Sequence, residues 1–343
     1  MNRLISLQKS NQLKAIAILM MLCLHLFNRD YQELFQPVLF IGAQPLSYYI
    51  SLFCDACVPV FAFVSGYGLY YKYSKEKQIY KKGNVIRLQK LYINYWVVLL
   101  LFAVLLGFIL GKEGYPGSWV KFLLNFTGLD PSYNGAWWFF TTYVLFVLTS
   151  SFWFRLLDWL NPYVFILFLL SLYVIAFYFR VYKTDVFEGN VGRWLHTQTA
   201  LYCCTLFQFM LGAFALKHKW HHRFSNIFSQ LKYSNVLAIV GIIVLIIWHG
   251  IVPNFIVAPF TGLGFIFLFL QINLGKIGNR VLDFLAPHAT NMWLIHMFFY
   301  MIYFKEFVYE FHYVPLIFLI LVLMCLGSSY IVNFMYQKIQ KLL

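Results

Sequence analysis

The stretch that organises this sequence runs from Asn11 to Phe27 and reads NQLKAIAILMMLCLHLF. It is an apolar run that carries a basic residue toward each end, Lys14 and His25. Eleven positions are almost three turns of an α-helix, so the two side chains project from the same face. At about 1.5 Å per residue they lie roughly 16 Å apart along the helix axis, about half the hydrocarbon thickness of a bilayer. An ionisable residue inside a membrane helix is costly and therefore indicates a functional site.

The rest of the chain has the same apolar character. Of its 343 residues, 62% are hydrophobic and 11% are charged, whereas about a quarter of a soluble domain is charged. Apolar runs of membrane-spanning length recur from end to end, which predicts an all-α polytopic membrane protein with a single integral-membrane domain over residues 1–343. The first run lacks a small-x-small cleavage site and more spans follow it, so we do not expect a cleavable signal peptide.

The hydropathy pattern predicts ten spans with both termini in the cytoplasm. They are expected at residues 11–28, 48–71, 91–111, 136–155, 162–180, 199–216, 235–250, 255–272, 289–304 and 313–335. This arrangement places 19 of the 26 Lys and Arg residues inside and 7 outside, as the positive-inside rule requires. Because the net charge of +14 gathers on one face, it indicates topology and contact with anionic lipids rather than nucleic-acid binding.

The densest cationic segment is the expected inner loop from Lys72 to Lys90. Contact with lipid headgroups is one interpretation of it. The other is a docking site for a polyanionic ligand, such as a nucleotide-containing acyl carrier. Arg87 and Lys90 favour the second interpretation, because positions three apart share a helix face and both cations can hold one phosphate group.

Two groups of potential metal ligands have a simpler explanation. Cys54 and Cys57 form a C-x-x-C pair, but no second pair or nearby histidine cluster completes a zinc site. His218, His221 and His222 lie together in an inner loop, where flanking lysines and arginines oppose the binding of another cation. We therefore expect no metal.

Two ionisable residues fall within or beside later spans. His296 is expected near the bilayer midplane of the ninth span, where it either belongs to the functional site or packs between helices. Asp55 lies near the outer end of the second span, the end toward which His25 also lies. It is either an interfacial carboxylate or the partner that orients the His25 ring.

Two motifs near span ends allow a structural and a chemical interpretation. The segment Val58–Tyr67 reads VPVFAFVSGY. Its Ser65-Gly66 pair lacks the G-x-S-x-G pattern of a nucleophile elbow and favours close helix approach instead. The segment NGAWWFF at 134–140 begins the fourth span at the outer face, where Trp137 and Trp138 either anchor the interface or stack on sugar rings.

Four features, in this order along the chain, resemble acyltransferase family 3, whose members are membrane enzymes that O-acylate surface polysaccharides and other extracytoplasmic acceptors. The four are Lys14-x10-His25, the motif Val58–Tyr67, the basic loop ending in Arg87-Leu88-Gln89-Lys90 before the aromatic stretch Tyr92–Trp96, and the WLIH motif Trp293–His296. Two positions differ from the family pattern. Lys90 replaces an arginine, which removes a bidentate phosphate contact, and Gln337–Gln340 stands where many relatives carry a glutamate.

On the donor side, the resemblance implies an O-acyltransferase that takes its acyl group from cytosolic acyl-CoA, most simply acetyl-CoA. The CoA phosphates would bind the inner cations, including Lys82, Arg87 and Lys90, and the pantetheine arm would pass Lys14. The thioester would reach His25, which acts as general base or as a transient acyl carrier. Lys14 can alternatively stabilise the developing oxyanion.

On the acceptor side, the resemblance implies transfer to a sugar hydroxyl of an extracytoplasmic glycan, from a protein in the bacterial cytoplasmic membrane. Asp55 would fix the tautomer of the catalytic imidazole, and Trp137, Trp138 and His296 would contact the acceptor. Membrane lipids are the other expected partner. The sequence specifies neither the glycan, nor acetyl against succinyl, nor the oligomeric state.

The competing class is a transporter or flippase of a lipid-linked sugar or small anion. Such a protein would use the same buried cations to hold its substrate without chemistry. The sequence shows no internal repeat of the kind that many transporters carry, and this counts against the transporter interpretation. An inactive scaffold is disfavoured by the intact pair of Lys14 and His25.

Overall fold

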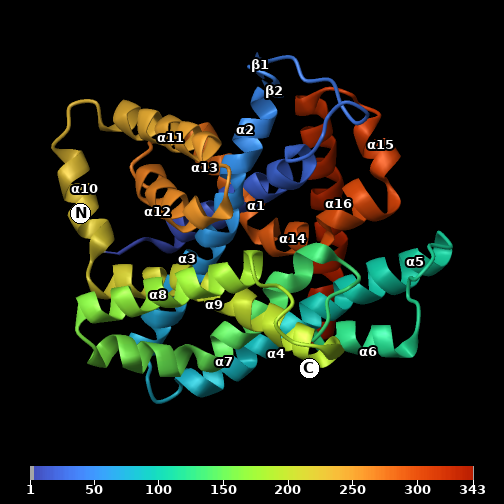
Figure 1. Ribbon diagram of the computed structural model, residues 1–343, viewed down its shortest axis with the longest axis horizontal. Coiled ribbons are helices and arrows are strands. Elements are labelled where there is room, and N and C mark those ends of the chain that lie inside the picture. Colours follow the sequence, from blue (N-terminus) through green and yellow to red (C-terminus); the bar gives the residue numbers. More distant parts are fainter. Residues whose placement is uncertain (1–3, 343) are drawn as a thin grey trace. The chain divides into compact units, whose positions relative to one another are not determined.

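The structure, a computed structural model, describes residues 4–342 and is almost entirely helical (Figure 1). Its chain folds into two compact units that are each discontinuous in sequence. Unit 1 comprises the described residues up to Leu13 together with Ala56–Asn84 and Thr142–Asn273, and unit 2 comprises Lys14–Asp55, Val85–Thr141 and the described residues from Leu274 onward. Three helices begin in one unit and end in the other: α1 (Leu7–Phe27), α4 (Tyr80–Val98) and α7 (Trp138–Trp159).

Eight helical stretches within residues 4–342 are long and apolar enough to cross a membrane, which confirms the prediction of an all-α polytopic protein. They are Leu7–Phe27, Leu46–Lys75, Tyr80–Ile109, Gly135–Trp159, Pro162–Val181, Gly189–Lys217, Ser234–Ile251 and Val314–Gln340. The other two expected spans are shorter or irregular. One is the apolar stretch Phe255–Phe269. The other divides into helix α14 (Ala289–Met297) and the π-helical segment η6 (Phe298–Tyr303).

The basic segment expected as an inner loop is mostly helical. Helix α3 (Cys57–Lys75) extends into its start, and α4 begins again at Tyr80. Arg87 and Lys90 therefore lie well inside α4, rather than where a loop enters a span. The charged turns prolong the two helices on the side where lysine and arginine stems reach water.

Unit 1 contains α3 and most of α7, with a further run of consecutive helices. These are α8 (Pro162–Val181), α9 (Gly189–Lys217), α10 (Trp220–Ser229), α11 (Ser234–Ile251), the 3₁₀ turn η4 (Phe255–Val257) and α12 (Ala258–Phe269). Asn161 caps α8 by accepting a hydrogen bond from the backbone N–H of Tyr163, and Pro162 takes the first helical position, where no N–H is needed. Helix α11 is apolar and mostly exposed, as expected of a helix that faces lipid.

The close contact of α3 with α9 forms the centre of unit 1, and it depends on glycine. A Cβ atom on Gly66 would lie 1.7 Å from the backbone oxygen of Phe209, and one on Gly212 would lie 2.0 Å from that of Phe63. Both distances are far below van der Waals contact, so only glycine fits. Ser65 hydrogen-bonds the carbonyl of Phe61 in its own helix. The small pair of the VPVFAFVSGY motif thus serves packing, as the sequence favoured.

Unit 2 contains most of α1 and α4 and the one strand pair of the described residues, β1 (Phe40–Ile41) with β2 (Gln44–Pro45). Its other elements are α2 (Leu46–Phe53), η1 (Cys54–Ala56, shared with unit 1), the π-helical η2 (Leu99–Leu105), α5 (Leu106–Ile109), α6 (Trp119–Thr127), η3 (Gly135–Trp137), α13 (Gly275–Leu285), η5 (Ala286–His288), α14, η6, α15 (Lys305–Tyr309) and α16 (Val314–Gln340). Helix α14 packs on α16, and buried polar side chains join them to α4.

Candidate functional site

Two histidines from distant parts of the chain meet in the interior of unit 2. His25 lies in the last turn of α1 and His296 in the last turn of α14. Their ring centroids are 5.1 Å apart, with 38° between the planes. The ring of Tyr300 stacks beside both, at 6.0 Å from His25 and 5.9 Å from His296. The structure therefore brings together two residues that the sequence singled out separately.

The hydrogen bonding of His296 fixes its tautomer. Its Nδ1 lies 2.7 Å from the carbonyl oxygen of Trp293, which can only accept, so Nδ1 carries the hydrogen. In the neutral ring the lone pair is then on Nε2. That atom is buried and has no hydrogen-bond partner among residues 4–342, and the whole side chain is 0% exposed. A buried unpaired acceptor costs about 1–3 kcal/mol, and Nε2 has an unused capacity to accept a hydrogen bond.

Arg29 completes this cluster, and sequence reasoning missed it together with Tyr300. The guanidinium donates from Nη2 to the carbonyl of His25 and lies over the Tyr300 ring, with Cζ 5.1 Å from the centroid. Arg29 follows His25 by four residues, and Tyr300 follows His296 by four. A search for partners one turn beyond each histidine would have found both. In the expected topology, Arg29 is one of the seven cations on the outer side. We call His25, Arg29, His296 and Tyr300 the histidine cluster.

Lys14 and His25 share one unbroken helix, as the opening stretch predicts. Helix α1 runs without interruption from Leu7 to Phe27, and both side chains are half-buried. Asp55 is also half-buried and lies in η1, between α2 and α3. Its pairing with the His25 ring stays a prediction, as does the assignment of Lys14 to the donor path.

The predicted phosphate-binding cations lie along α4. Arg87 is half-buried, while Lys82 and Lys90 are exposed. Asn94 is seven residues beyond Arg87, almost two turns further along the same helix face. It is buried, so α4 leads from exposed cations toward the interior of unit 2.

A chain of hydrogen-bonded amides continues from Asn94. Asn94 donates to Asn291 of α14 at 2.7 Å, and Asn291 donates to Asn333 of α16 at 2.8 Å. At the end of the chain, His288 Nδ1 lies 2.9 Å from the Ser329 hydroxyl. Buried polar groups need such partners, and this network holds the helix of His296 against its neighbours.

The aromatic segment at the start of the fourth span is bonded to the same helix. Trp137 is 0% exposed, and its indole N–H donates to the carbonyl of Leu294 at 2.8 Å. In return, the Trp293 indole donates to the carbonyl of Ala136 at 3.0 Å. Trp137 thus has no exposed ring face for a sugar in this structure and supports α14 instead. Trp138 is half-buried and retains exposed area.

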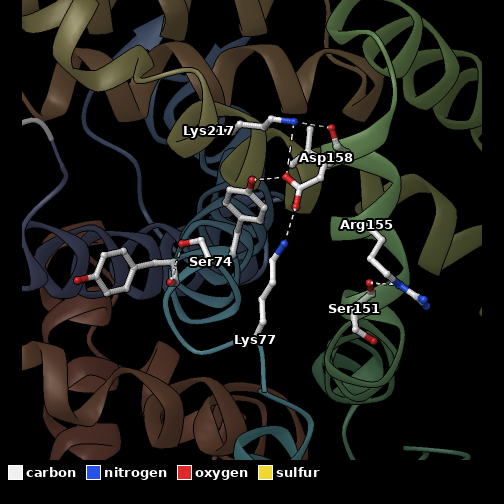
Figure 2. A network of polar contacts seen from close by, with 9 residues as sticks. Ser74, Lys77, Ser151, Arg155, Asp158 and Lys217 are labelled. Atoms are coloured by element: carbon white, nitrogen blue, oxygen red, sulfur yellow. Dashed lines mark hydrogen bonds and ion pairs between the residues drawn. The ribbon is translucent and has the colours of Figure 1, made fainter. Parts of the chain in front are cut away.

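A second charged cluster, in unit 1, surrounds Asp158 (Figure 2). The carboxylate accepts a hydrogen bond from the Tyr70 hydroxyl at 2.6 Å and lies 3.6 Å from Lys77 Nζ and 3.5 Å from Lys217 Nζ. Lys217 also donates to the carbonyl of Leu157 at 2.7 Å. These residues come from three segments that the sequence places on the inner side, so their meeting agrees with the predicted topology. The cluster joins the ends of helices.

The basic loop with three histidines carries no metal-binding arrangement. Within residues 4–342, no group of three or more His, Cys, Asp and Glu side chains is placed to hold a metal ion. Burial and the charges of Lys217 and Arg223 lower the pKa of His218. Burial, with a smaller effect of His222, lowers the pKa of His221. Burial is the larger cause of both shifts, and the positive surroundings noted in the sequence add to the shift of His218.

Comparison with known families gives one match. A family model described as "Acyltransferase domain", that of acyltransferase family 3, matches residues 8–334, nearly the whole chain. No curated protein and no solved structure matches the chain. The matched range contains every residue of the histidine cluster and all the predicted donor-binding cations.

Proposed function

This chain belongs to acyltransferase family 3, and we propose that it is a membrane O-acyltransferase that moves an acyl group, most simply acetyl, from cytosolic acyl-CoA to a sugar hydroxyl of an extracytoplasmic glycan. We place it in the bacterial cytoplasmic membrane. The observation that carries the proposal is the pair of imidazoles of His25 and His296, whose ring centroids lie 5.1 Å apart in unit 2. An imidazole with a bare nitrogen, as at Nε2 of His296, suits the handling of a hydroxyl proton.

The donor is held by cations of α4 in this proposal. Lys82, Arg87 and Lys90 bind the phosphates of CoA, and Lys14 contacts the pantetheine arm. Arg87 is the strongest of these contacts because its planar guanidinium matches two phosphate oxygens at once. The exposure of Lys82 and Lys90 leaves their ammonium groups accessible to a ligand from the aqueous phase.

His25 performs the chemistry in one of two ways. As a general base, it takes the proton of the acceptor hydroxyl while the oxygen forms a bond to the thioester carbon; the carbon–sulfur bond breaks, and the proton passes to the CoA thiolate. As an acyl carrier, its nitrogen attacks the thioester first and releases CoA, and the acceptor hydroxyl then attacks the acyl-imidazole. Both routes start from the neutral ring, which Asp55 orients in our proposal.

His296 and Trp138 act on the acceptor. The free Nε2 of His296 accepts a hydrogen bond from the acceptor hydroxyl and so aims its oxygen at the acyl carbon. The exposed part of Trp138 stacks on a sugar ring. Trp137 supports this arrangement from within, through its hydrogen bond to the carbonyl of Leu294 in the helix of His296.

The test uses purified protein in nanodiscs with labelled acetyl-CoA and a crude glycan fraction. Label transfer with CoA release supports the enzyme. The His25→Ala variant should lose transfer. The control is His196→Ala, which should keep it; His196 lies in unit 1 and is hydrogen-bonded to the carbonyl of Phe179. Movement of a lipid-linked sugar or anion across the bilayer without acyl turnover would instead favour the transporter.

A further inference from the structure

Arg29 is a half-buried cation beside His25, with a buried Nε, that the proposed mechanism leaves unused. Within residues 4–342, Arg29 takes part in no ion pair. Its two contacts in the histidine cluster are uncharged: the carbonyl of His25 and the ring of Tyr300. Its Nε is buried and has no hydrogen-bond partner.

Such a group is incomplete without an anion. Arginine keeps its charge at any pH at which a protein folds. A carbonyl and an aromatic face offset part of the cost of removing that charge from water, but neither neutralises it. The unused Nε–H also lies on the edge of the guanidinium fork that binds carboxylate or phosphate with two parallel hydrogen bonds. The geometry therefore matches an oxygen anion.

We propose that Arg29 is the anion-binding residue of the acceptor site, and that it holds a carboxylate or phosphate group that is a permanent part of the acceptor glycan. This inference rests on the proposed function and names its substrate class. Along α1 the order is Lys14, His25, Arg29. With the donor arriving past Lys14, Arg29 lies on the far side of the reactive imidazole, where the acceptor arrives.

The same cluster offers a place for the hydroxyl that reacts. The Arg29 guanidinium lies 5.1 Å from the Tyr300 centroid, and the His296 ring lies 5.9 Å from it. An anion at Arg29 and a hydroxyl at the free Nε2 of His296 thus lie around one tyrosine ring. A uronic acid, or a sugar joined to a phosphodiester, carries both an anion and a hydroxyl.

A binding experiment tests the site without requiring turnover. The ligands are D-glucuronate, inorganic phosphate and, as neutral control, glucose, titrated at constant ionic strength while the thermal unfolding of the protein in nanodiscs is followed. The wild type should be stabilised saturably by one or both anions and not by glucose. In Arg29→Gln the half-saturating concentration should rise at least tenfold, whereas Lys305→Gln, which removes another cation expected on the outer side, should bind as the wild type does.

The two anions distinguish the sources of the charge. Preference for glucuronate identifies a carboxylate-bearing sugar, and preference for phosphate identifies a phosphorylated one. Arg87→Gln separates this site from the donor site, because phosphate binding on α4 would be lost in that variant and retained in Arg29→Gln. Equal binding of both anions by Arg29→Gln and the wild type overturns the inference, and so does the absence of saturable binding to the wild type.

Kinetics distinguish a fixed anion from the oxyanion of the transfer step. For a fixed anion, Arg29→Gln should raise KM for an anionic acceptor at least tenfold and leave acceptor-independent CoA release unchanged, with Arg29→Lys partly restoring KM. Arg29→Gln would instead slow CoA release if Arg29 stabilises the oxyanion, and it would lower transfer equally to oligogalacturonate and to its carboxyl-reduced form. That result would reject the proposal. A wild type that binds glucuronate but never releases CoA would refute the proposed function alone.

Discussion

The imidazole of His296 is tied to the carbonyl of Trp293, one turn earlier in the same helix, by a 2.7 Å hydrogen bond at Nδ1. This bond separates the functions of the two ring nitrogens. One holds the ring in place, and the other, Nε2, is left bare and buried beside His25. The bond also holds the ring to α14 itself, so we expect changes at His296 to affect the orientation of the side chain as well as its hydrogen bonding.

We expect both His296→Asn and His296→Gln to impair transfer to the acceptor. Asparagine retains a donor for the carbonyl of Trp293 but reaches less far, while glutamine places its amide near the position of Nε2. Neither amide takes a proton at neutral pH, so both should lower transfer to the acceptor by about 10²-fold or more. Acceptor-independent CoA release should stay near wild type. If a variant slows CoA release as much as transfer, the assignment of His296 to acceptor binding is wrong.

Replacing His25 should have the largest effect in the protein. His25→Ala removes the nitrogen that both proposed routes need, and we expect label transfer to fall by about 10³-fold or more. The measurement is transfer of labelled acetyl by protein that inserts and elutes as the wild type does. Comparable activity in His25→Ala and His196→Ala would contradict the catalytic assignment.

The donor site can be tested in both directions. Arg87→Ala should raise KM for acetyl-CoA about tenfold, because a charge-assisted phosphate contact contributes about 1.5–3 kcal/mol. Lys90→Arg should lower KM, since guanidinium restores the bidentate contact. Steady-state kinetics with varied acetyl-CoA measure both effects. The control is Lys72→Ala, which removes an exposed lysine of the same basic segment and should leave KM unchanged. An unchanged KM in Arg87→Ala would show that the CoA phosphates do not bind at Arg87.

The contact of α3 with α9 predicts unequal effects for neighbouring glycines. Gly66→Ala should lower the unfolding temperature by several degrees, since its Cβ would meet the Phe209 backbone at 1.7 Å, and Gly212→Ala should do the same. Gly68→Ala has open space around it and should be neutral or slightly stabilising. Thermal unfolding in detergent compares the three. Equal effects at Gly66 and Gly68 would show that the helices can separate at little cost.

The sequence alone predicted the helical membrane fold, because hydropathy and loop charge depend on composition within single segments. It also selected His25 and His296, since an ionisable group in an apolar run stands out. It did not show that the two rings meet, because that depends on packing between α1 and α14. Trp137 illustrates the same limit: its position resembles an interfacial anchor, yet its indole is fully buried and bonded to Leu294.

Span boundaries and the broken ninth span were harder to predict for a related reason. The basic turns of α3 and α4 are polar, so hydropathy ends the span of α3 too early and begins the span of α4 too late. In the region after His296, the change from α- to π-helical hydrogen bonding at Phe298 has no composition signal. Arg29 and Tyr300 did have a signal, the four-residue spacing from each histidine, which composition counts overlook.

The anchored nitrogen of His296 also limits where hydrogen can go. An amide oxygen is far too weakly basic to receive the proton that its partner nitrogen would have to release, so no relay can run through this ring into the backbone. In the proposed mechanism, the proton of the acceptor hydroxyl passes through His25 to the thiolate of CoA. On this view, the spent carrier leaves as a thiol, and each turnover is electrically silent across the bilayer.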